Sequence, residues 1–180
     1  MKRAIFAAMF YLLSFSNHAY DESFVGTIGP VLKVSQLGDG VITTLGGRVS
    51  TTLINMLLLG MEGHGAVAQN RTLAINGRIE DISYYYGALG AGVRFFPESF
   101  IHLTNYNSFG LGQLSLNTSG KKGMVFNIEP ELNLEVDLFS LMRVGAGVSY
   151  RLLFAKSLNL ASATDLFGMG GQVFIEFGWL

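Results

Sequence analysis

The chain has 180 residues, of which 49% are hydrophobic and only 14% are charged, and its formal net charge is −1. A soluble domain has about 25% charged residues, so this composition is unusually apolar, and the near-neutral charge leaves no basic stripe for nucleic acid. The absence of cysteine excludes disulfides, thiolate metal sites and cysteine nucleophiles.

The first nineteen residues have the pattern of a secretory signal peptide. Lys2 and Arg3 precede an apolar stretch over 4–15, and the small residue Ala19 ends the segment. We expect cleavage after Ala19, which leaves a domain over 20–180. Without Lys2 and Arg3 it has 10 basic and 13 acidic residues, a net charge of −3.

The segment 126–136 is the most informative part of the mature chain. Every second residue from Phe126 to Val136 is apolar, apart from the central Pro130, and the residues between them are asparagine or glutamate. Side chains on a strand alternate between two faces, so one face is apolar and the other strongly polar. A tilted strand of about 9–11 residues crosses a bilayer, and the segment therefore predicts one strand of a membrane barrel.

Eight segments of this kind follow one another, at approximately 24–36, 41–51, 56–68, 83–95, 101–116, 124–136, 142–152 and 167–180. Short connections, around 52–55, 97–100 and 137–141, alternate with longer ones over 69–82, 117–123 and 153–166. Outer-membrane barrels have short periplasmic turns and longer outer loops. Pro30 and Pro130 fall inside two segments, where we expect bulges or locally open pairing because proline cannot donate to the ladder.

The period of two assigns each side chain to a face. We expect apolar residues outward: Phe24, Ile28, Leu32, Leu57, Leu59, Leu89, Val93, Phe126, Ile128, Leu132, Leu134, Val144, Val148, Val173, Ile175 and Phe177. We expect charged residues and histidines inward: Lys33, Arg48, Glu62, His64, Arg94, His102, Glu129, Glu131, Glu135, Arg143, Arg151 and Glu176.

The inward set contains five carboxylates and five permanent cations. A charge in a narrow interior must be paired or hydrated, so equal numbers of both signs predict a packed ionic network instead of a one-sign channel. Solvated charges at the barrel mouths are the alternative. We expect inward glycines, including Gly60, Gly90 and Gly145, to make room for long arginine and glutamate side chains.

The chain resembles the small eight-stranded outer-membrane β-barrel proteins of Gram-negative bacteria. The resemblance covers 24–180 and includes the closing stripe Val173, Ile175, Phe177 and Trp179, although Leu180 extends beyond it. It implies an all-β, antiparallel up-and-down transmembrane barrel in the outer membrane, contact with membrane lipid, and recognition of the C-terminal strand by the barrel-assembly machinery. The family includes structural proteins, adhesion factors and lipid-modifying enzymes, so the resemblance does not imply one activity.

Two kinds of chemistry compete with a structural role. Some outer-membrane barrels are lipid A deacylases with a His-x-Ser pair, which His102 and Thr104 resemble, with Ser108 following; threonine in place of serine departs from that pattern. A metal site from Glu62, His64 and His102 lacks a third ligand on a neighbouring strand, so we expect none.

Paired carboxylates at Glu129 and Glu131 suit acid–base chemistry, but the accompanying cations favour ion pairing. Eight strands leave an interior that side chains fill, which disfavours a continuous pore.

The sequence therefore predicts a barrel with a polar, side-chain-filled lumen and a structural or surface-interaction role. We expect no cofactor, and the loops 69–82, 117–123 and 153–166 are the regions where we expect contact with an extracellular ligand. The alternatives are an outer-membrane lipid-modifying hydrolase and a soluble lipocalin-like binder, whose apolar stripe would face inward.

Overall fold

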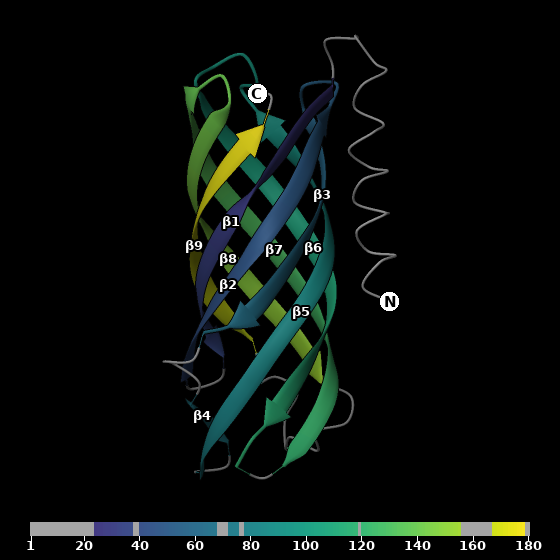
Figure 1. The fold of residues 1–180 in the computed structure, drawn as a ribbon, viewed down its shortest axis with the longest axis vertical. Coiled ribbons are helices and arrows are strands. Elements are labelled where there is room, and N and C mark those ends of the chain that lie inside the picture. The colour runs from purple at the N-terminus through teal and green to yellow at the C-terminus, as the bar shows by residue number, and fades with distance from the viewer. Residues whose placement is uncertain are drawn as a thin grey trace.

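The computed structural model describes residues 24–37, 40–67, 72–75, 78–118, 120–155 and 167–178. Eight long strands form a closed barrel (Figure 1). They are β1 (Phe24–Leu37), β2 (Gly40–Leu53), β3 (Leu57–Ala66), β5 (Arg78–Phe95), β6 (Ile101–Leu116), β7 (Lys121–Phe139), β8 (Met142–Ala155) and β9 (Gly168–Gly178). The short β4 (Thr72–Ile75) pairs with the beginning of β5.

All pairings are antiparallel, and the pairing of the first strand with the last closes the sheet. Strand β3 pairs with β5, and β1 pairs with β9, so the strands run up and down around one barrel. We call the end where β1 begins and β9 ends the terminal end, and the opposite end the far end. The predicted all-β, eight-stranded antiparallel barrel is confirmed. Among the described residues, no helix is long and apolar enough to span a membrane.

The predicted long connections are shorter in the structure. Strand β5 begins at Arg78, and its first residues pair with β4, so the predicted loop over 69–82 is wrong for these residues. Strand β7 begins at Lys121, which reduces the loop over 117–123 to a tight turn. Strand β8 continues to Ala155, and the remaining residues of the third loop, 156–166, lie outside the described residues.

Each of the two internal prolines lies where the pairing with one neighbouring strand is interrupted. The β1–β9 ladder has pairs up to Ile28 and again from Val31 without a change of register, so Pro30 lies in a gap of two residues. The β7–β8 ladder has a gap of the same size around Pro130. Each proline keeps its place in the ladder on its other side. The prediction of locally open pairing is therefore confirmed, and no bulge is needed at either proline.

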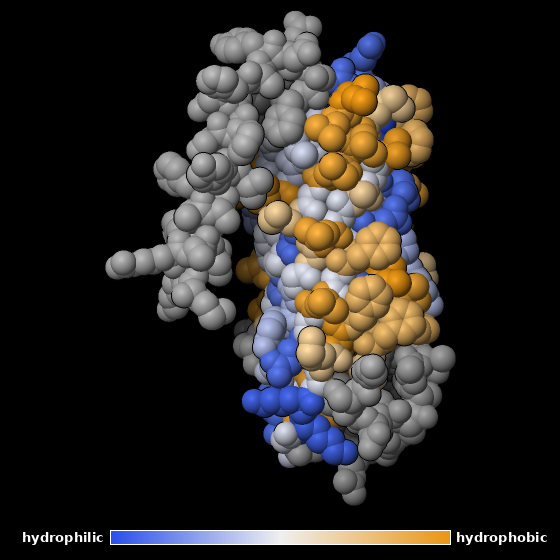
Figure 2. Space-filling view, turned by 90° about the vertical axis from the view of Figure 1, so that its right-hand side faces the viewer, coloured by the Kyte–Doolittle hydropathy of each residue, from blue (hydrophilic) through white to orange (hydrophobic). Residues whose placement is uncertain are grey.

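Apolar residues cover the outside of the barrel (Figure 2). Most residues that we expected outward are exposed: Ile28, Leu32, Leu57, Leu59, Leu89, Phe126, Leu132, Leu134, Val148, Val173, Ile175 and Phe177. Val93, Ile128 and Val144 are half-buried, and the side chain of Phe24 lies outside the described residues. A soluble protein rarely exposes such a large continuous apolar surface, so this surface suits a hydrocarbon environment.

The interior has an apolar layer that the sequence-based assignment did not include. It lies toward the far end and contains Leu37, Ile42, Ile82, Tyr84, Tyr86, Ala88, Leu114, Leu116, Val125 and Leu153. These side chains occupy inward positions at the far ends of β1, β2, β5, β6, β7 and β8. The middle of the lumen and its terminal end hold the charged residues, so an apolar layer covers the polar interior on one side.

Candidate functional site

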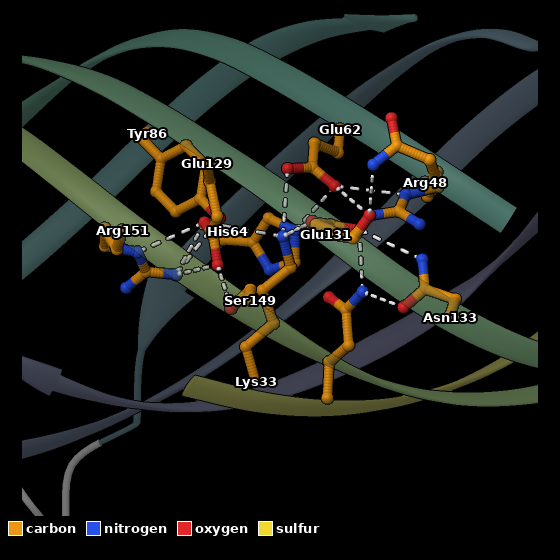
Figure 3. Close-up of polar contacts among 12 residues, drawn as sticks. Lys33, Arg48, Glu62, His64, Tyr86, Glu129, Glu131, Asn133, Ser149 and Arg151 are labelled. Atoms are coloured by element: carbon orange, nitrogen blue, oxygen red, sulfur yellow. Dashed lines mark hydrogen bonds and ion pairs between the residues drawn. The ribbon is translucent and has the colours of Figure 1, made fainter. Parts of the chain in front are cut away.

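All twelve charged or histidine side chains assigned inward are buried. Eleven of them belong to two clusters, one in the middle of the lumen and one at the terminal end, and Glu176 belongs to neither. The central cluster consists of Lys33, Arg48, Glu62, His64, Glu129, Glu131 and Arg151 (Figure 3). The terminal cluster consists of Arg94, His102, Glu135, Asp137 and Arg143.

Lys33 on β1 lies between three carboxylates. Its Nζ is 2.6 Å from Glu131 Oε1, 3.1 Å from Glu62 Oε1 and 3.6 Å from Glu129 Oε2. Glu129 and Glu131 reach it from β7, two positions apart on the same face, and Glu62 reaches it from β3. One ammonium group, which has three donors, therefore links three strands of the barrel.

Arg48 on β2 joins Glu62 and Glu131 from the other side. Its Nη2 donates to Glu62 Oε2 and to Glu131 Oε2, each at 2.7 Å, and its Nε donates to Glu62 Oε2 at 3.1 Å. Gln172 on β9 also donates to Glu131 Oε2, at 2.6 Å. Glu131 thus accepts hydrogen bonds from side chains on β1, β2 and β9.

Arg151 and Glu129 form the part of the cluster nearest the far end. The Nε and Nη2 atoms of Arg151 lie 3.1 and 3.0 Å from Glu129 Oε2, and Ser149 Oγ donates to Glu129 Oε1 at 2.9 Å. The guanidinium carbon of Arg151 is 5.5 Å from the centroid of the Tyr86 ring. The ring of His64 stacks on the ring of Tyr86, with a distance of 5.0 Å between the two centroids.

The formal charges of the central cluster balance. It contains three permanent cations, Lys33, Arg48 and Arg151, and three carboxylates, Glu62, Glu129 and Glu131. A buried charge is tolerated when it is paired and hydrogen-bonded. This balance suits a structural core better than a binding site for an ion of either sign.

The terminal cluster connects β5, β6, β7 and β8. Arg94 Nη2 lies 3.3 Å from Glu135 Oε2, and Arg143 Nη2 donates to Asp137 Oδ2 at 3.1 Å. Arg143 Nε is also 3.6 Å from Glu135 Oε2. Glu176 is buried opposite Arg143 on β9, but it makes no ion pair within 4.0 Å with the described residues.

The segment 137–141 was predicted as a turn, so Asp137 was not expected among the inward charges. The structure places it at the end of β7, where it contacts Arg143 and His102. The alternation of faces could have identified it, because Asp137 is an odd-numbered residue like Glu131, Asn133 and Glu135, whose side chains face the lumen. Gln172 and Tyr106 were also missed; both have inward parity but carry no charge.

Gly60, Gly90 and Gly145 make room for aromatic rings and not for long charged side chains, which corrects our expectation. A Cβ atom on Gly90 would overlap the ring of Tyr106, and one on Gly145 would overlap the ring of Phe174. These rings lie beside the guanidinium of Arg48, at 4.3 Å for Tyr106 and 5.6 Å for Phe174. The glycines therefore support the charged cluster indirectly.

The residues considered for hydrolysis do not form a nucleophile–base pair. His102 Nε2 is 2.8 Å from Asp137 Oδ2, and its Nδ1 is 3.0 Å from the carbonyl oxygen of Phe96. Both ring nitrogens are therefore occupied. The hydroxyl oxygens of Thr104 and Ser108 are buried and form no hydrogen bond with the described residues. Activation requires a base at hydrogen-bond distance from the nucleophile, and this arrangement does not provide one.

Glu62, His64 and His102 do not meet around a common point. Glu62 and His64 are neighbours, with His64 Nε2 3.4 Å from Glu62 Oε2, whereas His102 belongs to the terminal cluster. Within the described part of the chain, no three histidine, aspartate or glutamate side chains are placed to hold a metal ion.

Comparison with models of protein families and with curated protein sequences gives no match. Solved structures do match. Neisserial surface protein A superposes with a TM-score of 0.59 at 13% identity, covering 86% of this chain and 96% of that protein. The attachment invasion locus protein Ail of Yersinia pestis superposes with a TM-score of 0.52 at 10% identity, covering 87% and 98%. A second Ail structure, in complex with the heparin analogue sucrose octasulfate, gives 0.53 at 12% identity, covering 88% and 98%.

These similarities concern the whole barrel, since they cover nearly the full length of each matched protein. At such low identity they establish the architecture alone. They agree with the closed antiparallel sheet and the apolar exterior described above. The chain has the fold of the small eight-stranded outer-membrane β-barrel proteins of Gram-negative bacteria.

Proposed function

We propose that this protein is a sealed outer-membrane barrel with a structural and surface-interaction role. A signal peptide over 1–19 exports the chain, and the domain over 20–180 then inserts into the membrane. The apolar exterior contacts lipid, and the closed ladder satisfies backbone groups that hydrocarbon cannot hydrogen-bond. The terminal end then faces the periplasm and the far end faces outward, as short periplasmic turns require.

The filled lumen is the observation that carries this proposal. The two charged clusters occupy the middle and the periplasmic part of the interior, and the apolar layer with Leu114 and Leu153 lies above them. An eight-stranded barrel has little interior space beyond its side chains. A protein with this interior acts through its surfaces and not through a channel.

A liposome-swelling assay tests the sealed lumen. We expect vesicles that contain the folded protein to exclude small sugars as well as protein-free vesicles do, whereas a porin control makes them swell. Sugar entry at a rate similar to that of the porin would contradict the proposal. Heat-modifiable gel migration checks that the inserted protein is folded.

The outer ends of β5, β6 and β7 are the proposed contact region. These strands are the longest of the barrel, with 18, 16 and 19 residues, and β4 adds a hairpin to β5. Lys121 and Lys122 are exposed where β7 begins. Two adjacent cations at an outer tip suit an anionic glycan, and one of the similar barrels, Ail, has been observed with a heparin analogue.

Binding to immobilised heparin tests this contact region. We expect the double variant Lys121→Glu/Lys122→Glu to elute at lower salt than the parent protein, because two attractive charges become repulsive. Ser140→Glu, which adds negative charge to a periplasmic turn, is the control and should elute with the parent. Identical elution of all three proteins would contradict a role for this lysine pair.

Two further parts of the proposal concern assembly and the alternatives. The outward stripe Val173, Ile175 and Phe177 on β9 is the proposed signal for the barrel-assembly machinery; Trp179 and Leu180 lie outside the described residues. A soluble lipocalin-like binder is disfavoured because the apolar face is outside. A lipid-modifying hydrolase is disfavoured because His102 contacts neither Thr104 nor Ser108.

A further inference from the structure

Two asparagines interrupt the apolar exterior in the middle of β6. Asn105 and Asn107 are the fifth and seventh residues of this sixteen-residue strand, on the face that also carries the exposed Phe109. Both side chains are half-buried at the surface. A strand crosses the hydrocarbon in about 9–11 residues, so both amides lie well inside the bilayer. Figure 2 shows hydrophilic patches within the hydrophobic surface on one side of the barrel.

The barrel satisfies only part of the hydrogen-bonding capacity of these amides. Asn107 Nδ2 donates to Asn105 Oδ1 at 2.8 Å, and Asn105 Nδ2 donates to the carbonyl oxygen of Glu131 at 3.4 Å. Each amide has two N–H donors and a carbonyl oxygen with two lone pairs. Asn107 Oδ1 accepts no hydrogen bond from the described residues, and each amide keeps one further N–H. Hydrocarbon offers no partner for these groups.

The residues opposite Asn107 on the two neighbouring strands are short or rigid. Ala91 lies opposite it on β5 and Pro130 opposite it on β7, while the larger Leu89 and Leu132 stand on either side. Small residues beside polar ones allow two membrane proteins to approach closely enough for hydrogen bonds between side chains. The surface therefore has amide groups at its centre, little bulk opposite Asn107 on the two neighbouring strands, and apolar residues, including Phe109, around it.

We propose that this surface, centred on Asn105 and Asn107, is a contact between two copies of the chain in the membrane. A two-fold axis places a surface against itself, and an amide is self-complementary because it both donates and accepts. Lipid headgroups lie too far from the middle of the bilayer to supply these bonds. The proposal rests on insertion of the barrel in a membrane and goes beyond the sealed-barrel role.

The absence of native cysteine permits a direct test by disulfide cross-linking in phosphatidylcholine vesicles at low protein density. Ala91→Cys places one thiol beside the asparagine pair. Val173→Cys is the matched control, because β9 lies four strands from β5 in either direction and Val173 is at a similar distance from the end of its strand. We expect a covalent dimer from Ala91→Cys and little from Val173→Cys.

The amides are tested in the same Ala91→Cys background. Replacing both with leucine (Asn105→Leu/Asn107→Leu) should lower the dimer association constant by about tenfold, since the hydrogen bonds across the interface are lost. Leucine suits a lipid-facing position, so the heat-modifiable migration of the barrel should be retained. The proposal is overturned by no cross-linking at Ala91→Cys, by equal cross-linking at both positions, or by an unchanged association constant after the leucine replacements.

Failure of the sealed-barrel role gives a different result. A protein that conducts sugars but cross-links only at Ala91→Cys would contradict the proposed function and support the dimer. A sealed protein that cross-links at neither position would support the proposed function and contradict the dimer.

Discussion

The guanidinium carbon of Arg48 lies 4.3 Å from the centroid of the Tyr106 ring, within the range of a cation–π interaction. The ring can occupy this place because Gly60 and Gly90 have no side chain there. The same guanidinium donates to Glu62 and Glu131. The two glycines therefore leave space for the Tyr106 ring, and this ring packs on the guanidinium that forms the ion pairs.

The space that Gly90 leaves for the ring of Tyr106 should be essential for the stability of the barrel. Gly90→Ala places a Cβ atom against the ring of Tyr106, and overpacking of this kind destabilises a fold by about 1–3 kcal/mol. Gly87→Ala, on the same strand but facing outward, meets only the carbonyl oxygen of Glu62 at 3.9 Å and should change stability by no more than about 0.5 kcal/mol. Urea unfolding in detergent micelles measures both variants. Equal effects would show that the ring moves aside without cost.

Loss of the Glu131 carboxylate should strongly destabilise the barrel. In Glu131→Gln, Lys33 and Arg48 each lose a charged partner while both remain buried. Removing one partner of a buried ion pair destabilises by about 3–5 kcal/mol. Glu98→Gln, at an exposed residue in a turn at the terminal end, is the control of identical chemistry. A free energy of unfolding as high in Glu131→Gln as in Glu98→Gln would contradict the ionic core.

Arg151 and Glu129 should show strong energetic coupling. We expect Arg151→Met and Glu129→Gln to be destabilising singly, because each leaves an opposite charge unpaired beside it. The double variant removes both charges, so its loss should be smaller than the sum of the single losses by about 1 kcal/mol or more. A double-mutant cycle from urea titrations measures this difference. Additive losses would mean that the two side chains do not stabilise each other.

The terminal cluster gives a separate expectation. Arg143 contacts both Asp137 and Glu135, whereas Arg94 has Glu135 as its charged partner within 4.0 Å among the described residues. We expect Arg143→Met and Arg94→Met each to destabilise the barrel by about 3–5 kcal/mol, with the greater loss for Arg143→Met. Heat-modifiable gel migration at increasing temperature orders the variants. Unchanged unfolding temperatures for both would refute a stabilising role for this cluster.

Most of the architecture was accessible from the sequence because a strand assigns side chains to faces locally. The alternation in 126–136 predicted one strand of the barrel. The same period of two placed Lys33 and Glu131 inside without reference to any partner. The hairpin formed by β4 was missed, although Asn76-Gly77, the strongest short hairpin signal, stands between β4 and β5 in the sequence. Asp137 was missed because its segment was assigned to a turn.

The sequence by itself determined the eight long strands, the apolar outer face and most of the charges that turn inward. Only the tertiary structure decided which charges meet: Lys33 with Glu131, Arg151 with Glu129, and His102 with Asp137 instead of Thr104. It also decided that rings, and not long charged side chains, occupy the space beside Gly90 and Gly145. The physical reason is that a residue's face depends on its own backbone, whereas its partners across the lumen depend on how eight strands are registered and closed.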